Sequence, residues 1–144
     1  MVKKKFKART GFPFPRKDAQ KVGEELELVK AKGVLNPQSV LERAKNKKSI
    51  LHNLFEWDDT KAAEEYRIKQ AMNIVSNIIE VTIIKGEKVE ERAFFSVTVK
   101  KDENVYVSLT EAITTPSYRI QLLKEMETTL ENLLRLIKLF SSME

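Results

Sequence analysis

The sequence predicts an α+β domain with a helical N-terminal half, a three-stranded antiparallel β-meander and one long C-terminal helix. Changes in the spacing of apolar residues support this prediction. Apolar residues recur every three or four positions from about residue 17 to residue 77, then alternate with polar residues over 78–110. The helical spacing returns after residue 114 and continues to the last residues of the sequence.

The N-terminal segment is strongly basic. The first 17 residues contain seven Lys or Arg and no acid, so the charge of this segment alone, +7, exceeds the net charge of +5 of the whole chain. We therefore expect a flexible basic arm over 1–16, followed by a single α+β domain over 17–144. Phe12 and Phe14 are expected to pack this arm onto the core. Phe6 is equally suited to pack on the core and to contact a partner.

Helices are expected throughout the segment that follows the arm. The first spans 17–32 and ends at Gly33, a residue typical of the position after a helix. In "NPQSVLERAKN", Asn36 suits the N-cap of a second helix and Pro37 suits its first position. "SILHNLF" is expected to add one or two further turns.

The stretch "SILHNLFEWDDTKAAEEYR" holds the only Trp and the only His of the chain. We interpret Trp57, Asp58 and Asp59 as the structural start of a long helix that ends near Asn77. Acidic side chains at a helix start accept hydrogen bonds from exposed N–H groups and meet the positive end of the helix dipole. Trp57 would pack back against this helix as in a hydrophobic staple.

Two other interpretations of this stretch remain open. His52, Glu56 and the Asp pair are suitable ligands for a divalent metal, as in a metal-dependent nuclease, although no second acidic motif accompanies them. The helices and the following hairpin also suit a DNA-reading head with a β wing. However, the acids at the helix entrance would repel phosphate.

The β region is expected to form strands at 78–84, 92–100 and 105–110. The intervening loops "KGEKVE" and "KDEN" are short enough for hairpins. One face of these strands is apolar and the other is polar, which is typical of an antiparallel sheet that covers a core on one side.

The C-terminal helix carries apolar residues at spacings of 3, 4, 3, 4 and 3, a heptad repeat. The repeat consists of Leu123, Met126, Leu130, Leu133, Ile137 and Phe140. Further leucines widen the apolar surface, namely Leu122, Leu134, Leu136 and Leu139. A helix this apolar must be buried, either against the sheet of its own chain or in an oligomer interface formed by the repeat.

Composition excludes several classes of site. The absence of Cys excludes disulfides, zinc–thiolate sites and Cys nucleophiles. No apolar run approaches the ~20 residues of a membrane span, and no apolar segment of a signal peptide follows the basic start. A glycine-rich phosphate loop and a Ser–His–Asp grouping are also missing. We therefore expect a soluble, cytoplasmic, non-enzymatic protein with no catalytic residues, no cofactor and no metal.

Residues 35–71 resemble a widespread group of small uncharacterised bacteriophage proteins. The resemblance lies in "LH..FEWDD..AA..YR..QA", preceded by a helix like "NPQSVLERA", and it extends weakly from "GFPFPRKDAQKVGEEL" to "LRLIKLF". This chain departs from the pattern at "NKKSILH", where the group tends to have Ser-Pro before Leu-His, and at Met72, where a basic residue is usual. The resemblance implies phage origin and an infected bacterial host, but no particular chemistry.

These observations lead to one leading functional hypothesis. We expect a phage accessory protein that binds nucleic acid, DNA rather than RNA, largely independently of sequence, because a flexible cationic arm contacts phosphates rather than base edges. The expected nucleic-acid-binding residues are Lys3, Lys4, Lys5, Lys7, Arg9, Arg16 and Lys17 in the arm, with Lys45, Lys47 and Lys48 as a second cluster. The alternative is a homodimer or higher oligomer that serves as a protein–protein interaction module, either a scaffold or an inhibitor of a host enzyme.

Overall fold

The computed structural model of the chain describes residues 4–11, 15–59 and 63–142. The chain divides into two compact units, Met1–Leu109 and Thr110–Glu144, and each is described separately. The expected α+β class is confirmed: N-terminal helices precede a three-stranded antiparallel sheet, and a long helix follows. The expected division was an arm over 1–16 followed by one domain over 17–144. The observed boundary at Leu109 differs from it.

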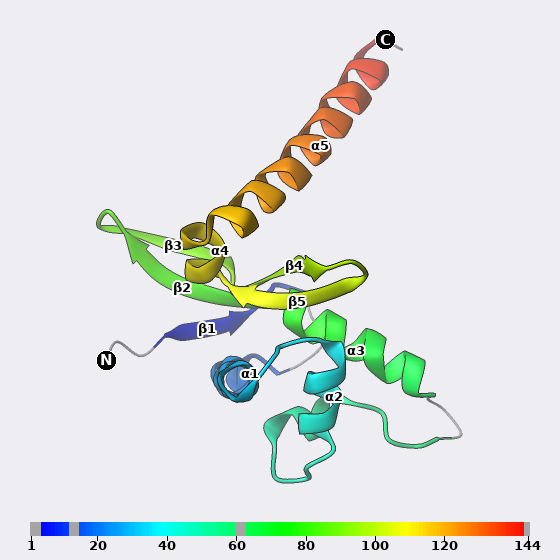
Figure 1. The fold of residues 1–144 in the computed structure, drawn as a ribbon. Helices are drawn as coiled ribbons and strands as arrows, with labels where there is room; N and C mark the ends of the chain where they lie inside the picture. Colours follow the sequence, from blue (N-terminus) through cyan, green and yellow to red (C-terminus); the bar gives the residue numbers. More distant parts are fainter. Residues whose placement is uncertain (1–3, 12–14, 60–62, 143–144) are drawn as a thin grey trace. The chain divides into compact units, whose positions relative to one another are not determined.

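The first unit contains short helices and two small sheets (Figure 1). Its helical elements are η1 (Arg16–Asp18), α1 (Ala19–Lys32), α2 (Pro37–Ala44), η2 (Ile50–Leu54) and α3 (Glu64–Ser76). Its strands are β1 (Lys5–Ala8), β2 (Ile78–Ile84), β3 (Glu87–Arg92), β4 (Phe94–Lys100) and β5 (Glu103–Ser108). The second unit contains α4 (Leu109–Thr114), which begins at the boundary, and α5 (Pro116–Ser141).

Local sequence signals place the first helices as expected. The N–H of Ser39 donates to the Asn36 side chain, and the N–H of Asn36 donates to the Ser39 hydroxyl, so both residues form a reciprocal capping box at the start of α2. Pro37 occupies the first turn, where its missing N–H costs nothing. Gly33 follows the last residue of α1.

The membership of the three-stranded sheet corrects the predicted meander. The sheet has the order β1-β2-β3, and β4 pairs with β5 in a separate two-stranded sheet. Strand β3 occupies most of the segment that was expected to be a loop, because Lys85 and Gly86 alone make the turn after β2. Both residues have positive φ, at 52° and 82°, which is the conformation that a tight two-residue hairpin turn requires.

The two sheets meet at Ala93, which lies between β3 and β4. Its N–H donates to the carbonyl of Ile78 on β2, and its own carbonyl accepts a hydrogen bond from the N–H of Leu109 after β5. Because one continuous segment pairs first with β2 and then with β5, Ala93 is the corner at which the chain changes sheets. Its side chain is buried.

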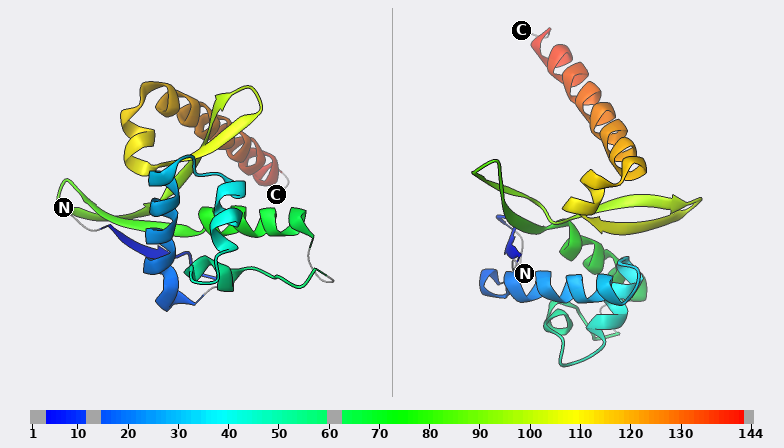
Figure 2. Two further views of the ribbon diagram at one scale, coloured as in Figure 1. Left: turned by 60° about the horizontal axis from the view of Figure 1, so that its bottom comes forward. Right: turned by 60° about the vertical axis from the view of Figure 1, so that its left-hand side comes forward.

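Strand β1 corrects the expectation of a separate flexible arm. Lys5–Ala8 pairs antiparallel with Ile78–Val81 of β2, and Phe6 is buried in the core. Part of the outer edge of β1 is bonded to α1, because the Gln20 side chain accepts from the N–H of Phe6 at 2.9 Å and donates to the carbonyl of Lys4 at 2.8 Å. Figure 2 shows β1 beside β2 and α1.

The core of the first unit lies between its helices and its strands. Phe6 contacts α1 at Gly23, the position where a Cβ atom would lie 2.1 Å from the ring of Phe6. The largest fully buried side chains are Phe94, Leu26, Leu35, Leu41, Leu51 and Ile78. The strand that was expected to be part of a flexible basic arm therefore contributes an aromatic residue to this core. Phe12 and Phe14 lie outside the described residues.

The long helix α3 begins later than expected. It starts at Glu64, and its N-cap is Ala63, which provides no side-chain hydrogen bond. The prediction that Trp57, Asp58 and Asp59 form the helix start is therefore wrong. Glu64 and Glu65 occupy the first turn, where their charges meet the positive end of the helix dipole.

Candidate functional site

The cations of the basic arm fall into two groups. Lys4 donates to Glu27 at 2.9 Å and lies 3.5 Å from Glu80, and Lys7 is paired with Glu90 across the sheet. Neither lysine is therefore an unpaired cation for phosphate. The other described cations of this segment, Lys5, Arg9, Arg16 and Lys17, are exposed and form no ion pair within the described part of the chain. Lys3 lies outside that part.

Glu80 is the most deeply buried acid among the described residues, with 6% of its side chain exposed. Its Oε1 has no hydrogen bond within the described residues, and the Lys4 ammonium group is the charge that compensates it. Burial lowers the pKa of Lys4, but the hydrogen bond and charge of Glu27, together with Glu80, outweigh burial and raise it. Because the pKa of Lys4 is higher in the folded chain than in the unfolded chain, the ionised Lys4 side chain contributes its full stabilisation up to about pH 10, and this contribution is lost as the pH rises through the raised pKa.

A pocket of about 580 Å³ opens beside this pair, between β1 and the β2–β3 hairpin. It is lined by Lys4, Lys5, Glu80, Val81, Thr82, Ile83 and Lys88. The Oε1 atom of Glu80 is covered, so it cannot receive a donor from a ligand without rearrangement. We interpret Glu80 as the internal counter-ion of Lys4.

The second expected cationic cluster lies after α2. Lys45 is paired with Glu42 at 2.7 Å, whereas the exposed side chains of Lys47 and Lys48 form no ion pair within the described chain. Two of the three lysines of this cluster therefore remain available to an anionic partner.

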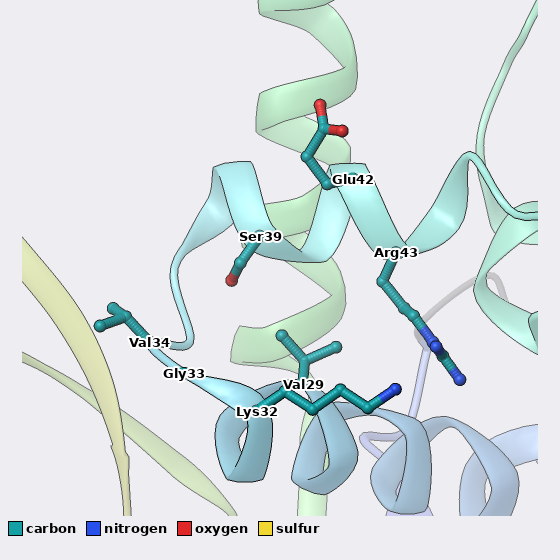
Figure 3. A pocket seen from close by; sticks show the side chains of 7 residues that line it. All are labelled: Val29, Lys32, Gly33, Val34, Ser39, Glu42 and Arg43. Atoms are coloured by element: carbon teal, nitrogen blue, oxygen red, sulfur yellow. The ribbon is translucent and has the colours of Figure 1, made fainter.

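A shallow pocket of about 440 Å³ lies between the end of α1 and the start of α2 (Figure 3). Glu42 points away from α1, whereas the side chain of Arg43 extends toward it. Arg43 donates to both carboxylate oxygens of Glu25, at 2.8 and 3.3 Å. This bidentate pair joins α1 to α2 and neutralises the guanidinium group, so we assign the pocket no ligand.

The aromatic stretch around Trp57 forms a structural cluster. The indole stacks on the His52 ring at 4.8 Å between centroids, and the guanidinium of Arg67 lies 5.4 Å from the indole centroid. The indole N–H donates to the carbonyl of His52, and His52 Nδ1 donates to the carbonyl of Ala44. These contacts anchor the segment between η2 and α3 onto the helices.

The acids of this stretch are arranged as structural partners rather than as metal ligands. Arg67 donates to the carbonyl of Glu56 at 2.9 Å and is paired with Asp59. Within residues 4–11, 15–59 and 63–142, no group of three or more His, Asp or Glu side chains is arranged to hold a metal ion. The geometry therefore offers no support for the metal-dependent nuclease.

Arg67 is expected to matter more for stability than Asp59. The Arg67 side chain is 12% exposed, whereas that of Asp59 is 85% exposed. Arg67→Ala removes a charged hydrogen bond and a cation–π contact, so we expect it to lower the free energy of unfolding by about 2 kcal/mol. Asp59→Ala should lower it by less than about 0.5 kcal/mol, because exposed ion pairs contribute little. Urea unfolding of both variants tests this, and equal losses would contradict it.

The second unit presents the most extensive exposed apolar surface of the described chain. The six residues of the heptad repeat in α5, here called the seam, are 50–72% exposed. Four further apolar side chains of α5 are 44–57% exposed, namely Ile120, Leu134, Leu136 and Leu139. Leu122, by contrast, is buried. Because α5 and the short α4 make up this unit, the unit alone cannot cover that surface.

Sequence reasoning located the seam, but it missed three residues that position other parts of the molecule. Gln20 bonds the outer edge of β1 at Phe6 and Lys4, Gly23 accommodates Phe6, and Arg67 holds the Trp57 cluster. Each role depends on contacts between residues far apart in sequence. The only local signal was Gly23, a helix-disfavouring residue inside an apolar helical pattern, which often marks close packing.

No family model, no curated protein and no solved structure matches the chain. The membership of a phage protein group therefore stays a prediction. Within the described residues, no helix is both long enough and apolar enough to cross a membrane.

Proposed function

We propose that the protein is a non-enzymatic interaction module that forms homo-oligomers, with α5 of each copy packing against α5 of another. The observation that carries this proposal is the exposed seam, which extends along α5 from Leu123 to Phe140. Leaving such a surface in water is costly, and soluble proteins rarely expose large contiguous apolar patches unless they bind a partner there.

The spacing of the seam favours a second copy of the chain as the partner. A strict seven-residue repeat keeps the apolar residues of two supercoiled helices facing each other, and identical helices have identical repeats. Nine of these apolar residues, all but Leu139, lie within one continuous sector of α5. At roughly 80 Å² for each half-exposed side chain, they expose about 700 Å², close to the roughly 800 Å² that one partner contributes to a standard interface.

Substitutions in the seam test self-association directly. We expect Leu130→Lys with Ile137→Lys to shift the protein to monomer in sedimentation velocity, because both ammonium groups would enter the apolar interface. Thr128→Lys with Asn132→Lys adds the same charge on the opposite side of α5 and should leave the mass unchanged. Equal behaviour of the two variants would refute an interface at the seam.

A second candidate function is weak, sequence-independent binding of nucleic acid. Its support is the exposed cations without ion pairs that lie in the two predicted clusters: Lys5, Arg9, Arg16 and Lys17 in the basic arm, and Lys47 and Lys48 after α2. Such residues neutralise phosphates and release counterions, so binding would weaken steeply with salt. If the resemblance to phage proteins holds, contacts between these cations and phosphate would suit a DNA-associated accessory role. Contacts through the seam would suit a scaffold or an inhibitor of a host enzyme.

Neutral substitutions test this candidate without disturbing the fold. We expect Lys5→Gln with Arg9→Gln and Lys17→Gln to reduce the slope of log affinity against log salt concentration by about two to three for duplex DNA. Lys100→Gln with Lys101→Gln, at the end of β4 and the start of the following turn, is the control, because these exposed lysines belong to neither predicted cluster and the slope should change little. An unchanged slope in the triple variant, or no binding at low salt, would remove this candidate.

A further inference from the structure

The apolar surface of α5 is wider than the seam. At about 100° per residue, the six seam residues span about 100° of the helix circumference. Ile120 and Leu134 extend the surface on one side, and Leu136 extends it on the other. Together these three residues, here called the flanks, widen the exposed apolar sector to about 200°.

The width of this sector determines how many neighbouring helices can cover it. In a two-stranded coiled coil each helix meets a single partner along a narrow seam. A dimer of α5 would bury the seam and leave much of the flanks in water. A helix with two neighbours, as in a three- or four-helix bundle, buries apolar residues on both sides of the seam.

The residue types in the seam agree with this reading. Two-stranded parallel coils are favoured by β-branched residues at the first seam position of each heptad and Leu at the second. Here Leu123 and Leu130 occupy two of the three first positions, with Met126 and Phe140 at two of the second. The seam therefore lacks the pattern that specifies two strands.

We infer that α5 assembles into a bundle of three or four helices contributed by separate copies of this chain, and not into a dimer. The inference rests on the proposed self-association and specifies its stoichiometry. Its occupant for each flank is the α5 helix of a further copy. The seam and the flanks thus have separate roles: the seam forms the first helix–helix contact, and the flanks accept the additional helices.

The mass of the full-length protein tests this inference in sedimentation equilibrium. We expect the wild-type chain to have three or four times the monomer mass. Ile120→Gln with Leu134→Gln and Leu136→Gln should reduce it to a dimer, because Gln has a helix propensity close to that of Leu but resists burial. Thr128→Gln with Asn132→Gln, on the opposite side of α5, should keep the wild-type mass.

The outcomes separate this inference from the proposed function. A wild-type dimer would overturn the bundle and leave self-association intact. A wild-type monomer would overturn both. A flank variant that keeps the wild-type mass of three or four chains, with circular dichroism confirming an intact helix content, would show that the flanks do not recruit further helices and would overturn the inference.

Discussion

Gly23→Ala is expected to destabilise the protein strongly, although alanine is the better helix former. A Cβ atom at this position would lie 2.1 Å from Cγ of Phe6 and 2.7 Å from its Cβ. These atoms are close to the backbone of β1, which is held by its pairing with β2 and by Gln20. We expect the clash to exceed the gain of about 1 kcal/mol in helix propensity and to lower the free energy of unfolding by about 2–4 kcal/mol.

A double-mutant cycle separates this clash from any other effect of the substitution. Phe6→Ala alone should cost about 3–5 kcal/mol, because it leaves a cavity under β1. In the double variant the new methyl group enters that cavity, so the combined loss should be smaller than the sum of the single losses. Additive losses in chemical denaturation would contradict close contact between Phe6 and Gly23.

Deletion of residues 1–9 is expected to unfold the first unit or bring it close to unfolding. The deletion removes Phe6 from the core, the pairing of β1 with β2, and the ammonium group of Lys4 beside buried Glu80. The loss of the aromatic side chain alone is worth about 3–5 kcal/mol, and typical domains are stable by only about 5–15 kcal/mol. Thermal unfolding followed by circular dichroism measures the loss.

The matched control keeps the strand and removes only exposed charge. Lys5→Gln with Arg9→Gln should change the free energy of unfolding by less than about 0.5 kcal/mol, because neither side chain is buried or paired. If the truncated protein kept the wild-type melting temperature, β1 would not be part of the folded unit. Because the truncation is expected to unfold the first unit, a loss of nucleic-acid binding by the truncated protein would not show that the arm contacts nucleic acid. Substitution of the exposed cations tests that contact without unfolding the protein.

The elements that the sequence predicted well are those specified by neighbouring residues. Asn36 and Pro37 fix the start of α2, and Gly33 follows the end of α1, so these helices were recognised from local pattern alone. The seam of α5 was equally visible, because its repeat lies within one helix. Such signals need no knowledge of the rest of the fold.

The strands that were missed, β1 and β3, lack an apolar alternation long enough to identify them. β1 has four residues with cations on either side of Phe6, and its partner β2 lies about seventy positions later in the chain. β3 consists mainly of charged residues because both of its faces are largely exposed. The dipeptide Lys85-Gly86 was the available signal for this hairpin, since glycine readily adopts positive φ.

The start of α3 was misplaced because paired acids are typical of a helix N-terminus but do not require one. Asp59 instead pairs with Arg67, and Trp57 is held by His52, so the preceding segment is fixed by side-chain contacts rather than by helical hydrogen bonds. These contacts join residues of η2, the connecting segment and α3. Sequence pattern alone could not reveal them.

Sedimentation equilibrium of the wild-type chain over a range of concentrations tests the central claim most directly. If the apolar surface of α5 is covered by other copies, the fitted mass should be a multiple of 16.6 kDa and should fall toward that value only on dilution. A mass of 16.6 kDa at every concentration would contradict self-association through α5.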